Sequence, residues 1–154
     1  LSEGAEPAGL GARDTLRMEM GFPLYGSELS ARRNAAESGL LGVIADKTFI
    51  GSAVVRDATL RNDRLVVLVL EGRRAARAHD SIVDLQGERI GTVTSGGFAP
   101  SLGKSIAMGY TRISGSQPGT RLVIRTARAD LNATVGEAPL YRGTSRMALE
   151  HFLK

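Results

Sequence analysis

Two arginines, Arg13 and Arg17, lie four residues apart in the segment G-L-G-A-R-D-T-L-R-M-E-M-G that begins at Gly9. Side chains with this spacing share one face of a helix, so the two guanidinium groups come together near the helix start. Such a pair can hold an anion through charge-assisted hydrogen bonds. A solvated basic face has the same spacing, and the spacing by itself favours that plainer interpretation.

Other residue types that carry chemistry are sparse. His79 and His151 are the two histidines, no acidic cluster accompanies them and cysteine is absent, which argues against a metal site and excludes disulfides. The Thr94-Ser95-Gly96 stretch lacks the G-x-S-x-G pattern of a nucleophilic serine, and the sequence contains no P-loop. We therefore expect no catalytic residue and no metal ligand in this chain.

The arginine pair requires a helix, and the local sequence predicts one over residues 12–20. Asp14 lies in the first turn, where the positive end of the helix dipole favours a carboxylate. Gly21 follows the last helical residue, and Pro23 prevents the helix from continuing.

Weaker signals follow this helix. Residues 31–38 can form a short helix ended by Gly39, and the apolar run 40–45 has the length of a strand. Residues 49–55 are ambiguous by periodicity. Tyr25 is a candidate for a buried hydroxyl that fixes the loop after the first helix.

The sequence becomes β-rich after residue 60. The run 65–70 is continuously apolar, as expected for a strand buried on both faces. Gly87 suits a tight hairpin turn, and residues 95–100 are predicted as a loop. Regular strands joined by glycine-rich turns predict a mainly β fold, a small antiparallel barrel or sandwich over residues 60–142. The further predicted strands are 81–85, 88–94, 105–111, 122–126 and 131–135.

Composition limits the class of protein. The 154 residues, 42% hydrophobic and 23% charged, fit one globular domain or one domain with a piece of another. The net charge is +4, and the runs Arg32-Arg33 and Arg73-Arg74 with Arg77 could attract an anionic ligand or an acidic partner, although solvated surface is the plainer interpretation. Aromatic residues make up 5%, which disfavours a nucleic-acid partner. No apolar run approaches the roughly 20 residues that span a bilayer, so no membrane partner is expected.

Several segments, taken in order, resemble the aminomethyltransferase of the glycine cleavage system, the T-protein. The first is G-L-G-A-R-D-T-L-R-x-E-x-G followed by P-L-Y-G; then come K-T-F-I-G from Lys47, G-T-V-T-S-G from Gly91, G-T-R-L from Gly119 and P-L-Y from Pro139. Their order and spacing make chance a poor explanation. In that family the first segment lies well past the middle of the chain, so the resemblance is to the C-terminal part only. The family segment that matches F-I-G opens a helix, which favours a helix over 49–55.

The resemblance implies a fold of three domains around a channel for folate. This chain would keep a short helical segment from an adjoining, largely missing α/β domain, followed by a jellyroll or Greek-key barrel. The expected parts are residues 1–59 as remnant and connector of the folate-binding domain (helices 12–20 and 31–38), residues 60–142 as the barrel, and residues 143–154 as a tail with a short helix over 147–153.

The resemblance also implies an activity. The family transfers the methylene group from the aminomethyl-lipoyl arm of the H-protein to tetrahydrofolate and releases ammonia. The arginine of G-A-R-D faces folate, which assigns Arg13 to the site; Phe22 could pack against the folate ring, and Arg17 is expected to keep a structural role at the surface. The family's catalytic aspartate lies in the N-terminal part and no residue here matches it, so this chain alone is expected to be inactive. The expected location is the cytoplasm, or the mitochondrial matrix in a eukaryote.

The sequence also departs from the family pattern. Ala76 and His79 take the proline and second glycine places of G-R-x-x-P-R-x-G, and Ala127-Arg128-Ala129 replaces a usual R-G-K turn. These departures leave room for two alternatives. One is the T-protein-like folate domain of a dimethylglycine- or sarcosine-oxidising enzyme or a demethylase, and the other is a stand-alone, non-catalytic β-barrel that binds a macromolecule. The oligomeric state stays open, because a face that once met absent domains could drive association through its apolar area.

Overall fold

The structure is a computed structural model that describes residues 4, 6–33, 35–57 and 61–143. Its helical elements are α1 (Leu10–Met20), the 3-10 turn η1 (Leu41–Val43), α2 (Ser52–Arg56) and the 3-10 turn η3 (Ile113–Gly115). Its strands are β1 (Asp63–Leu70), β2 (Ser81–Val83), β3 (Arg89–Ala99), β4 (Lys104–Arg112), β5 (Arg121–Arg125) and β6 (Asp130–Gly136). The tail helix predicted over 147–153 lies outside the described residues.

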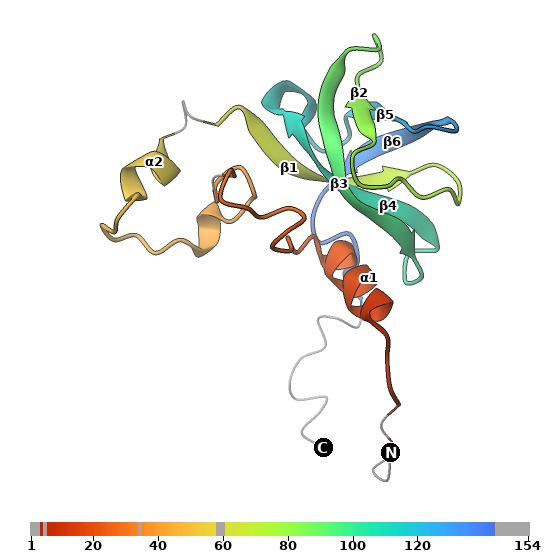
Figure 1. The fold of residues 1–154 in the computed structure, drawn as a ribbon, viewed down its shortest axis with the longest axis horizontal. Coiled ribbons are helices and arrows are strands. Elements are labelled where there is room, and N and C mark those ends of the chain that lie inside the picture. The colour runs from red at the N-terminus through yellow and green to blue at the C-terminus, as the bar shows by residue number, and fades with distance from the viewer. Residues whose placement is uncertain (1–3, 5, 34, 58–60, 144–154) are drawn as a thin grey trace.

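These strands close into an antiparallel barrel in the order β1-β4-β3-β2-β5-β6 (Figure 1). Strand β1 pairs with both β4 and β6 and so joins the β2-β3-β4 meander to the β5-β6 hairpin. Because β1 lies beside β4 rather than beside β2, its neighbour in sequence, the arrangement has Greek-key order. The mainly β fold and the small antiparallel barrel predicted from the sequence are confirmed.

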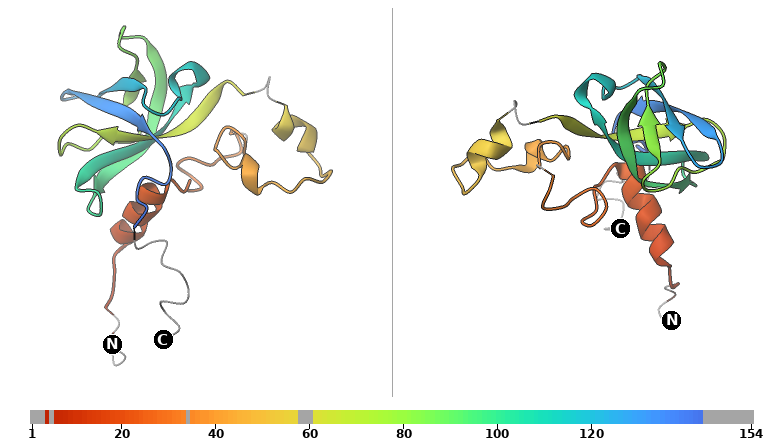
Figure 2. Two further views of the ribbon diagram at one scale, coloured as in Figure 1. Left: turned by 180° about the vertical axis from the view of Figure 1, so that it is seen from behind. Right: turned by 45° about the horizontal axis from the view of Figure 1, so that its top comes forward.

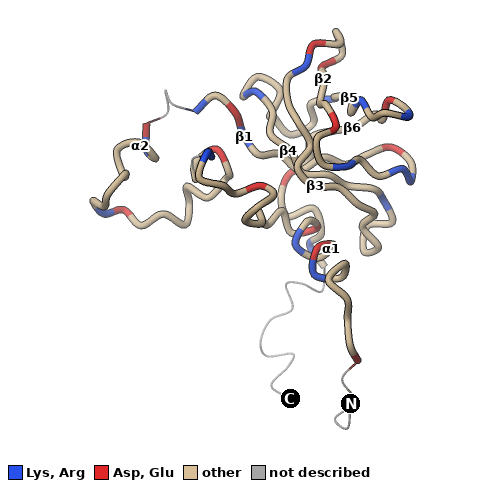
Figure 3. The backbone as a smooth tube through the Cα atoms, in the orientation of Figure 1, with Lys and Arg blue, Asp and Glu red and all other residues tan. Residues whose placement is uncertain are grey.

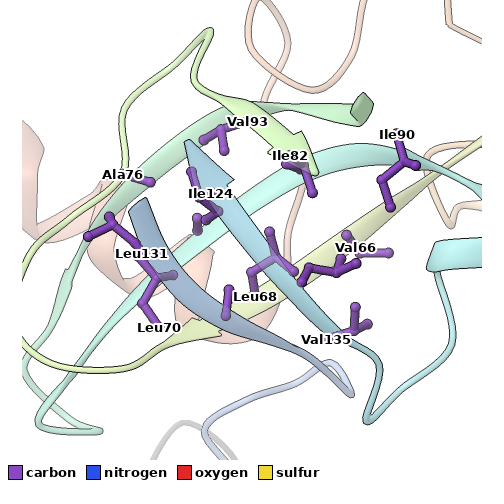
Figure 4. Close-up of a cluster of buried hydrophobic side chains, with 13 residues drawn as sticks. Val66, Leu68, Leu70, Ala76, Ile82, Ile90, Val93, Ile124, Leu131 and Val135 are labelled. Carbon is purple, nitrogen blue, oxygen red and sulfur yellow. The ribbon is translucent and has the colours of Figure 1, made fainter. Parts of the chain in front are cut away.

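One apolar core fills the barrel. Thirteen buried residues contribute to it, drawn from all six strands and from Ala76 in the β1-β2 connection (Figure 4). A second cluster lies on the outside of the barrel, where Met18 of α1 packs with Val67, Ile106 and Met108. Strands β1 and β4 are therefore buried on both faces, as the apolar run at 65–70 predicted.

Helix α1 ends in the way that its sequence predicts. The N–H of Phe22 donates to the carbonyl of Arg17 at 2.8 Å, and the N–H of Gly21 donates to that of Met18 at 3.0 Å, which is a Schellman motif. Gly21 has φ 71°, and a Cβ there would lie 2.6 Å from the Cβ of Ala138. Both the backbone angle and the close approach therefore require glycine at this position.

Only the second half of α1 packs against the barrel. Met18 and Glu19 are buried, whereas Leu10 is 85% and Leu16 is 58% exposed. The carbonyl of Glu19 accepts the N–H groups of Leu140 at 2.9 Å and of the next residue at 3.1 Å. The first half of the helix projects beyond the barrel (Figures 1 and 2).

Two predictions between α1 and β1 are wrong. Residues 31–38 form turns instead of a helix where they are described, and the run 40–45 contains η1 instead of a strand. Contacts distant in sequence decide the first case: the Glu37 carbonyl accepts the N–H of Leu65 at 2.8 Å, and tertiary contacts override weak helix propensity. Residues 41–43 are exposed and pair with no described strand. The helix favoured over 49–55 is present as α2.

The loop predicted over 95–100 is also wrong, because β3 continues through Ala99. A Cβ at Gly96 would lie 2.5 Å from the carbonyl oxygen of Ala76, and one at Gly97 would lie 3.3 Å from the Met18 side chain. These glycines therefore allow the neighbouring backbone and α1 to approach the strand closely, and they do not form a turn.

His79 occupies the left-handed backbone region with φ 76°, at a place where the resemblance leads us to expect glycine. Non-glycine residues pay roughly 1–2 kcal/mol there, whereas glycine costs roughly 0.5–1 kcal/mol through the entropy of the unfolded chain. We expect His79→Gly to raise the free energy of unfolding by about 0.5–1 kcal/mol, measured by urea denaturation. His79→Ala is the control, because it keeps a Cβ and should give no gain. A less stable glycine variant would contradict the assignment of strain.

Candidate functional site

Arg13 and Phe22, the residues assigned to folate, lie toward opposite ends of α1. Arg13 is on the exposed first half, and its guanidinium contacts no hydrogen-bond or ion-pair partner among the residues that the structure describes. Phe22 is 59% exposed and follows the C-cap Gly21. A rise of 1.5 Å per residue separates Arg13 from Gly21 by about 12 Å. A ligand that touched both side chains would therefore have to be elongated.

Arg17 is not the surface residue expected from its spacing, because its side chain is only 9% exposed. Its Nε donates to Asp14 Oδ1 at 2.7 Å, its Nη1 to Glu28 Oε2 at 2.7 Å and its Nη2 to Ser95 Oγ at 2.8 Å. The guanidinium thus faces the barrel, whereas Arg13, one turn earlier, stays exposed. The two arginines share a helix face but do not form the anion-holding pair that the spacing allows.

The carboxylate of Glu28 lies at the centre of these contacts and is fully buried, with a side-chain exposure of 0%. Oε2 accepts Arg17 Nη1 and the N–H of Leu24 at 2.9 Å. Oε1 accepts the hydroxyl of Ser95 at 2.6 Å and that of Thr94 at 2.7 Å. Since both oxygens are occupied by donors, this carboxylate is a structural acceptor and not a free base. We call Arg17, Glu28, Thr94 and Ser95 the buried cluster.

A β-bulge in β3 explains how two consecutive hydroxyls reach one oxygen. Val93 pairs with Gly109 and Ser95 pairs with Met108, so Thr94 is an extra residue in the β3-β4 ladder. Consecutive residues of a regular strand point to opposite faces, and a bulge changes this alternation locally. Neither the bulge nor Glu28 was predicted, because the strand was predicted to end at residue 94 with a loop from Ser95, and one glutamate in a loop carries no pattern at all.

Tyr110 on β4 binds the same loop from a different side. Its hydroxyl donates to the carbonyl oxygen of Glu28 at 2.9 Å and lies 2.6 Å from Ser38 Oγ. A phenol has one proton, so Ser38 is the donor in the second bond. The tyrosine hydroxyl that fixes the loop is therefore that of Tyr110, and the prediction for Tyr25, which is 76% exposed, is wrong.

The surroundings of Tyr110 change its acidity. Burial raises the pKa of Tyr110 above its usual value, while the hydrogen bond with Ser38 and the charge of Arg33 act in the opposite direction. The guanidinium carbon of Arg33 lies 4.0 Å from the ring centroid, and Arg33 also pairs with Asp63 at 2.7 Å. The neutral phenol is the form that this environment stabilises.

Among the hollows on the described surface, two are lined by residues singled out in the sequence. One, of about 380 Å³, lies between residues 26–33 and the barrel, and His79 and Tyr110 are among its lining residues. The other, of about 460 Å³, is lined by Arg74, Arg77 and Arg128 together with Asp80 and four uncharged residues. Acidic and basic residues are interspersed along the barrel, so the basic runs of the sequence do not merge into one stripe (Figure 3).

The described residues include no group of three or more histidine or acidic side chains that could hold a metal ion. In the same part of the chain, no helix is long and apolar enough to cross a membrane. The carboxylate of Glu28 already accepts four donors, whereas the Arg13 guanidinium on α1 and the Phe22 ring just after the helix are exposed. Exposed groups of these two kinds are able to contact a ligand.

We expect Tyr110→Phe to lower the free energy of unfolding by about 1–3 kcal/mol at neutral pH, because it leaves the buried Glu28 carbonyl without this donor. The pKa of Tyr110 is raised in the folded state, so its contribution is complete below the unfolded-state value of about 10 and is lost as pH rises through the folded value. The stability gap between the two proteins should therefore narrow above about pH 10.

Urea titrations of both proteins from neutral to strongly alkaline pH measure this gap. Tyr25→Phe is the matched control, because it removes an exposed hydroxyl and should change stability at neutral pH by less than about 0.5 kcal/mol. A gap that stays constant through the alkaline range would contradict the role assigned to Tyr110.

Comparison with known proteins matches residues 64–142 to the family model of the glycine cleavage T-protein C-terminal barrel domain. The aminomethyltransferase of Cutibacterium acnes is 38% identical over 144 residues, which is 91% of this chain and 38% of that protein. The aminomethyltransferase of Thermotoga petrophila is 41% identical over 150 residues, 91% of this chain and 39% of that protein. The chain thus spans about two fifths of the length of these curated relatives.

A solved structure gives the same result. The crystal structure of the glycine cleavage system aminomethyltransferase T from Bartonella henselae superposes with a TM-score of 0.81 at 29% identity, over 88% of this chain and 40% of that one. The superposition covers 88% of the chain, whereas the barrel family model matches residues 64–142 alone. The structural similarity therefore extends beyond the barrel. The chain therefore belongs to the glycine cleavage T-protein family and resembles the C-terminal part of its members, a closed antiparallel barrel preceded by a short helical segment.

Proposed function

We propose that this chain is the C-terminal part of a tetrahydrofolate-dependent aminomethyltransferase of the glycine cleavage system. In this proposal the longer protein transfers the methylene group from the aminomethyl-lipoyl arm of the H-protein to tetrahydrofolate and releases ammonia. The matched relatives are named aminomethyltransferases, which favours this function over a dimethylglycine- or sarcosine-oxidising enzyme and over a stand-alone binding barrel. They come from bacteria, which supports the cytoplasm as the location.

The observation that carries the proposal is the exposed guanidinium of Arg13, which has no partner among the described residues, on a helix whose second half is firmly packed. A guanidinium in this position suits the anionic and carbonyl oxygens of a folate. Phe22 exposes an aromatic ring at the other end of α1, where it can pack against an aromatic part of the ligand. Folates are elongated molecules, so the separation of the two side chains agrees with this assignment.

Exposed apolar side chains on the segment before the barrel support the proposal that other parts of the longer protein cover it. A concentration of such side chains marks a surface that another protein part covers. The large hydrophobic residues exposed there are Leu10, Leu16, Phe22, Tyr25, Leu41, Val43, Phe49, Ile50 and Val54, against two in the described barrel region. We propose that the covering part supplies the remaining walls of the folate pocket and the acid–base group, so that this chain alone is inactive.

The H-protein is proposed as the partner on the strength of the family. The hollow lined by Arg74, Arg77 and Arg128 is a positively charged surface that suits an acidic protein. Arg74 and Arg77 belong to one of the basic runs singled out in the sequence, and the fold brings Arg128 to them from the β5-β6 turn.

In the full-length enzyme we expect Arg13→Ala to weaken the binding of tetrahydrofolate by about 1–3 kcal/mol, the usual loss for a charged hydrogen bond. Isothermal titration calorimetry measures the dissociation constant directly. Arg64→Ala serves as the control, because Arg64 is an exposed arginine on β1 whose removal should leave the constant unchanged. An unaltered constant for the Arg13 variant would remove Arg13 from the site.

We expect the 154-residue chain by itself to bind tetrahydrofolate only weakly, because α1 presents one side of a pocket and leaves it open to solvent. The same calorimetric titration, carried out on this chain, tests the expectation. Micromolar binding by the chain alone would show that the pocket lies within it, and the proposed division between this chain and a longer protein would then be wrong.

A further inference from the structure

We propose that the buried cluster is a positioning device: Arg17 and Glu28, braced by Thr94 and Ser95, fix the rotation of α1 and thereby the direction in which Arg13 points. The inference rests on the proposed function for its purpose, because Arg13 is the residue assigned to folate. The cluster itself is a property of this chain and can be tested without any ligand.

Apolar packing alone leaves the rotation of α1 poorly determined. Met18 packs into the cluster on the outer face of the barrel, and such contacts are not directional. Glu19 adds directional bonds near the end of the helix: its Oε1 accepts the N–H of Ser101 at 3.1 Å, and its carbonyl accepts the N–H groups of Leu140 and the residue after it. The Arg17 guanidinium adds two side-chain bonds to groups outside the helix, to Glu28 and to Ser95, and a planar fork of this kind is geometrically demanding.

Arg13 follows the rotation that Arg17 sets. Residues four apart lie nearly above one another on a helix, so a turn of the helix at Arg17 moves Arg13 by almost the same angle. Arg13 has no partner of its own among the described residues to restore its direction. The direction of its guanidinium is therefore set one turn away, where Arg17 bonds to Glu28 and Ser95.

The fold makes this arrangement rigid. Glu28 receives donors from α1, from its own loop and from β3, so no one of these elements can move without breaking a bond to a fully buried carboxylate. The β3 bulge is what supplies two adjacent hydroxyls to the same oxygen. Ser95 is the centre of the link, because its hydroxyl accepts from Arg17 and donates to Glu28.

The first test uses hydrogen–deuterium exchange on this 154-residue chain. Ser95→Ala keeps both charges and removes the central hydroxyl, and we expect the hydrogen-bonded amides of α1 to lose roughly tenfold or more of their protection. Glu28→Gln should do the same or more, because it removes the buried negative charge with which Arg17 pairs. Amides of β5 and β6 should keep their protection in Ser95→Ala, and the exposed Glu88→Gln is the matched control.

Thr94 offers a conservative rescue in the same experiment. Thr94→Val removes the hydroxyl at similar volume and should speed the exchange of the α1 amides. Thr94→Ser keeps the hydroxyl, so the α1 amides should exchange as slowly as in the wild type. If Glu28→Gln unfolds the barrel as a whole, Ser95→Ala remains decisive. Wild-type protection of α1 in both Ser95→Ala and Thr94→Val would overturn the proposal.

The second test is a double-mutant cycle on folate binding by the full-length enzyme. Ser95→Ala should raise the KM for tetrahydrofolate, and it should have almost no further effect once Arg13→Ala is present, because the group that it positions is gone. Additive effects of the two substitutions would show a general structural role and overturn the positioning role. A full-length protein that does not bind tetrahydrofolate would instead refute the proposed function, while the exchange data still report whether α1 is held by the cluster.

Discussion

The buried carboxylate of Glu28 needs donors from three parts of the chain, and this requirement determines how the segment before the barrel lies on it. An ionised carboxylate without partners is strongly destabilising in a protein interior, and removing one partner of a buried pair costs about 3–5 kcal/mol. Helix α1 contributes Arg17, the loop contributes its own Leu24 N–H, and β3 contributes two hydroxyls. The carbonyl oxygen of the same residue is held by Tyr110 of β4. One residue therefore joins the loop to the helix and to two strands.

The barrel can hold this charge because β3 and β4 are unusually well supported. Both strands contact the interior core on one side and α1 or its loop on the other. Their close pairing also depends on small residues: a Cβ at Gly109 would lie 2.7 Å from the carbonyl oxygen of Thr92, and one at Gly91 would collide with that of Tyr110. The wall that receives α1 is thus rigid before any ligand is considered.

Alternation and turn chemistry were enough to predict the barrel, and Gly21 and Pro23 were enough to predict the end of α1, because these signals are local. The start of α1 was predicted wrongly: the helix begins at Leu10, so Asp14 lies beyond its first turn. Secondary structure was predicted wrongly where contacts with residues distant in sequence determine the local conformation. Residues 31–38 have helical propensity but are held as turns by β1 and β4. The glycines after Ser95 suggested a loop, since nothing in the sequence shows that Ala76 and Met18 approach them.

The residues of the candidate site show the same difference between local signals and distant contacts. Arg13 was singled out by its motif, and its guanidinium is exposed with no partner among the described residues. Arg17 has the same residue type and the same helix face, yet the barrel surface lies beside only one of them, so spacing could not distinguish a buried arginine from an exposed one. Glu28 could not be found at all without the bulge that brings Thr94 and Ser95 to it.

The departures from the family pattern at Ala76, at His79 and in the 127–129 turn all lie within the barrel region. Arg128 lies in the turn that usually reads R-G-K, and it lines the basic hollow with Arg77. His79 lines the other hollow with its backbone in the left-handed region. Helix α1, in contrast, keeps the G-L-G-A-R-D-T-L-R sequence of the family. Two of these departures therefore line hollows on the barrel surface and Ala76 lies in its core, whereas the helix that carries Arg13 and Arg17 keeps the family sequence.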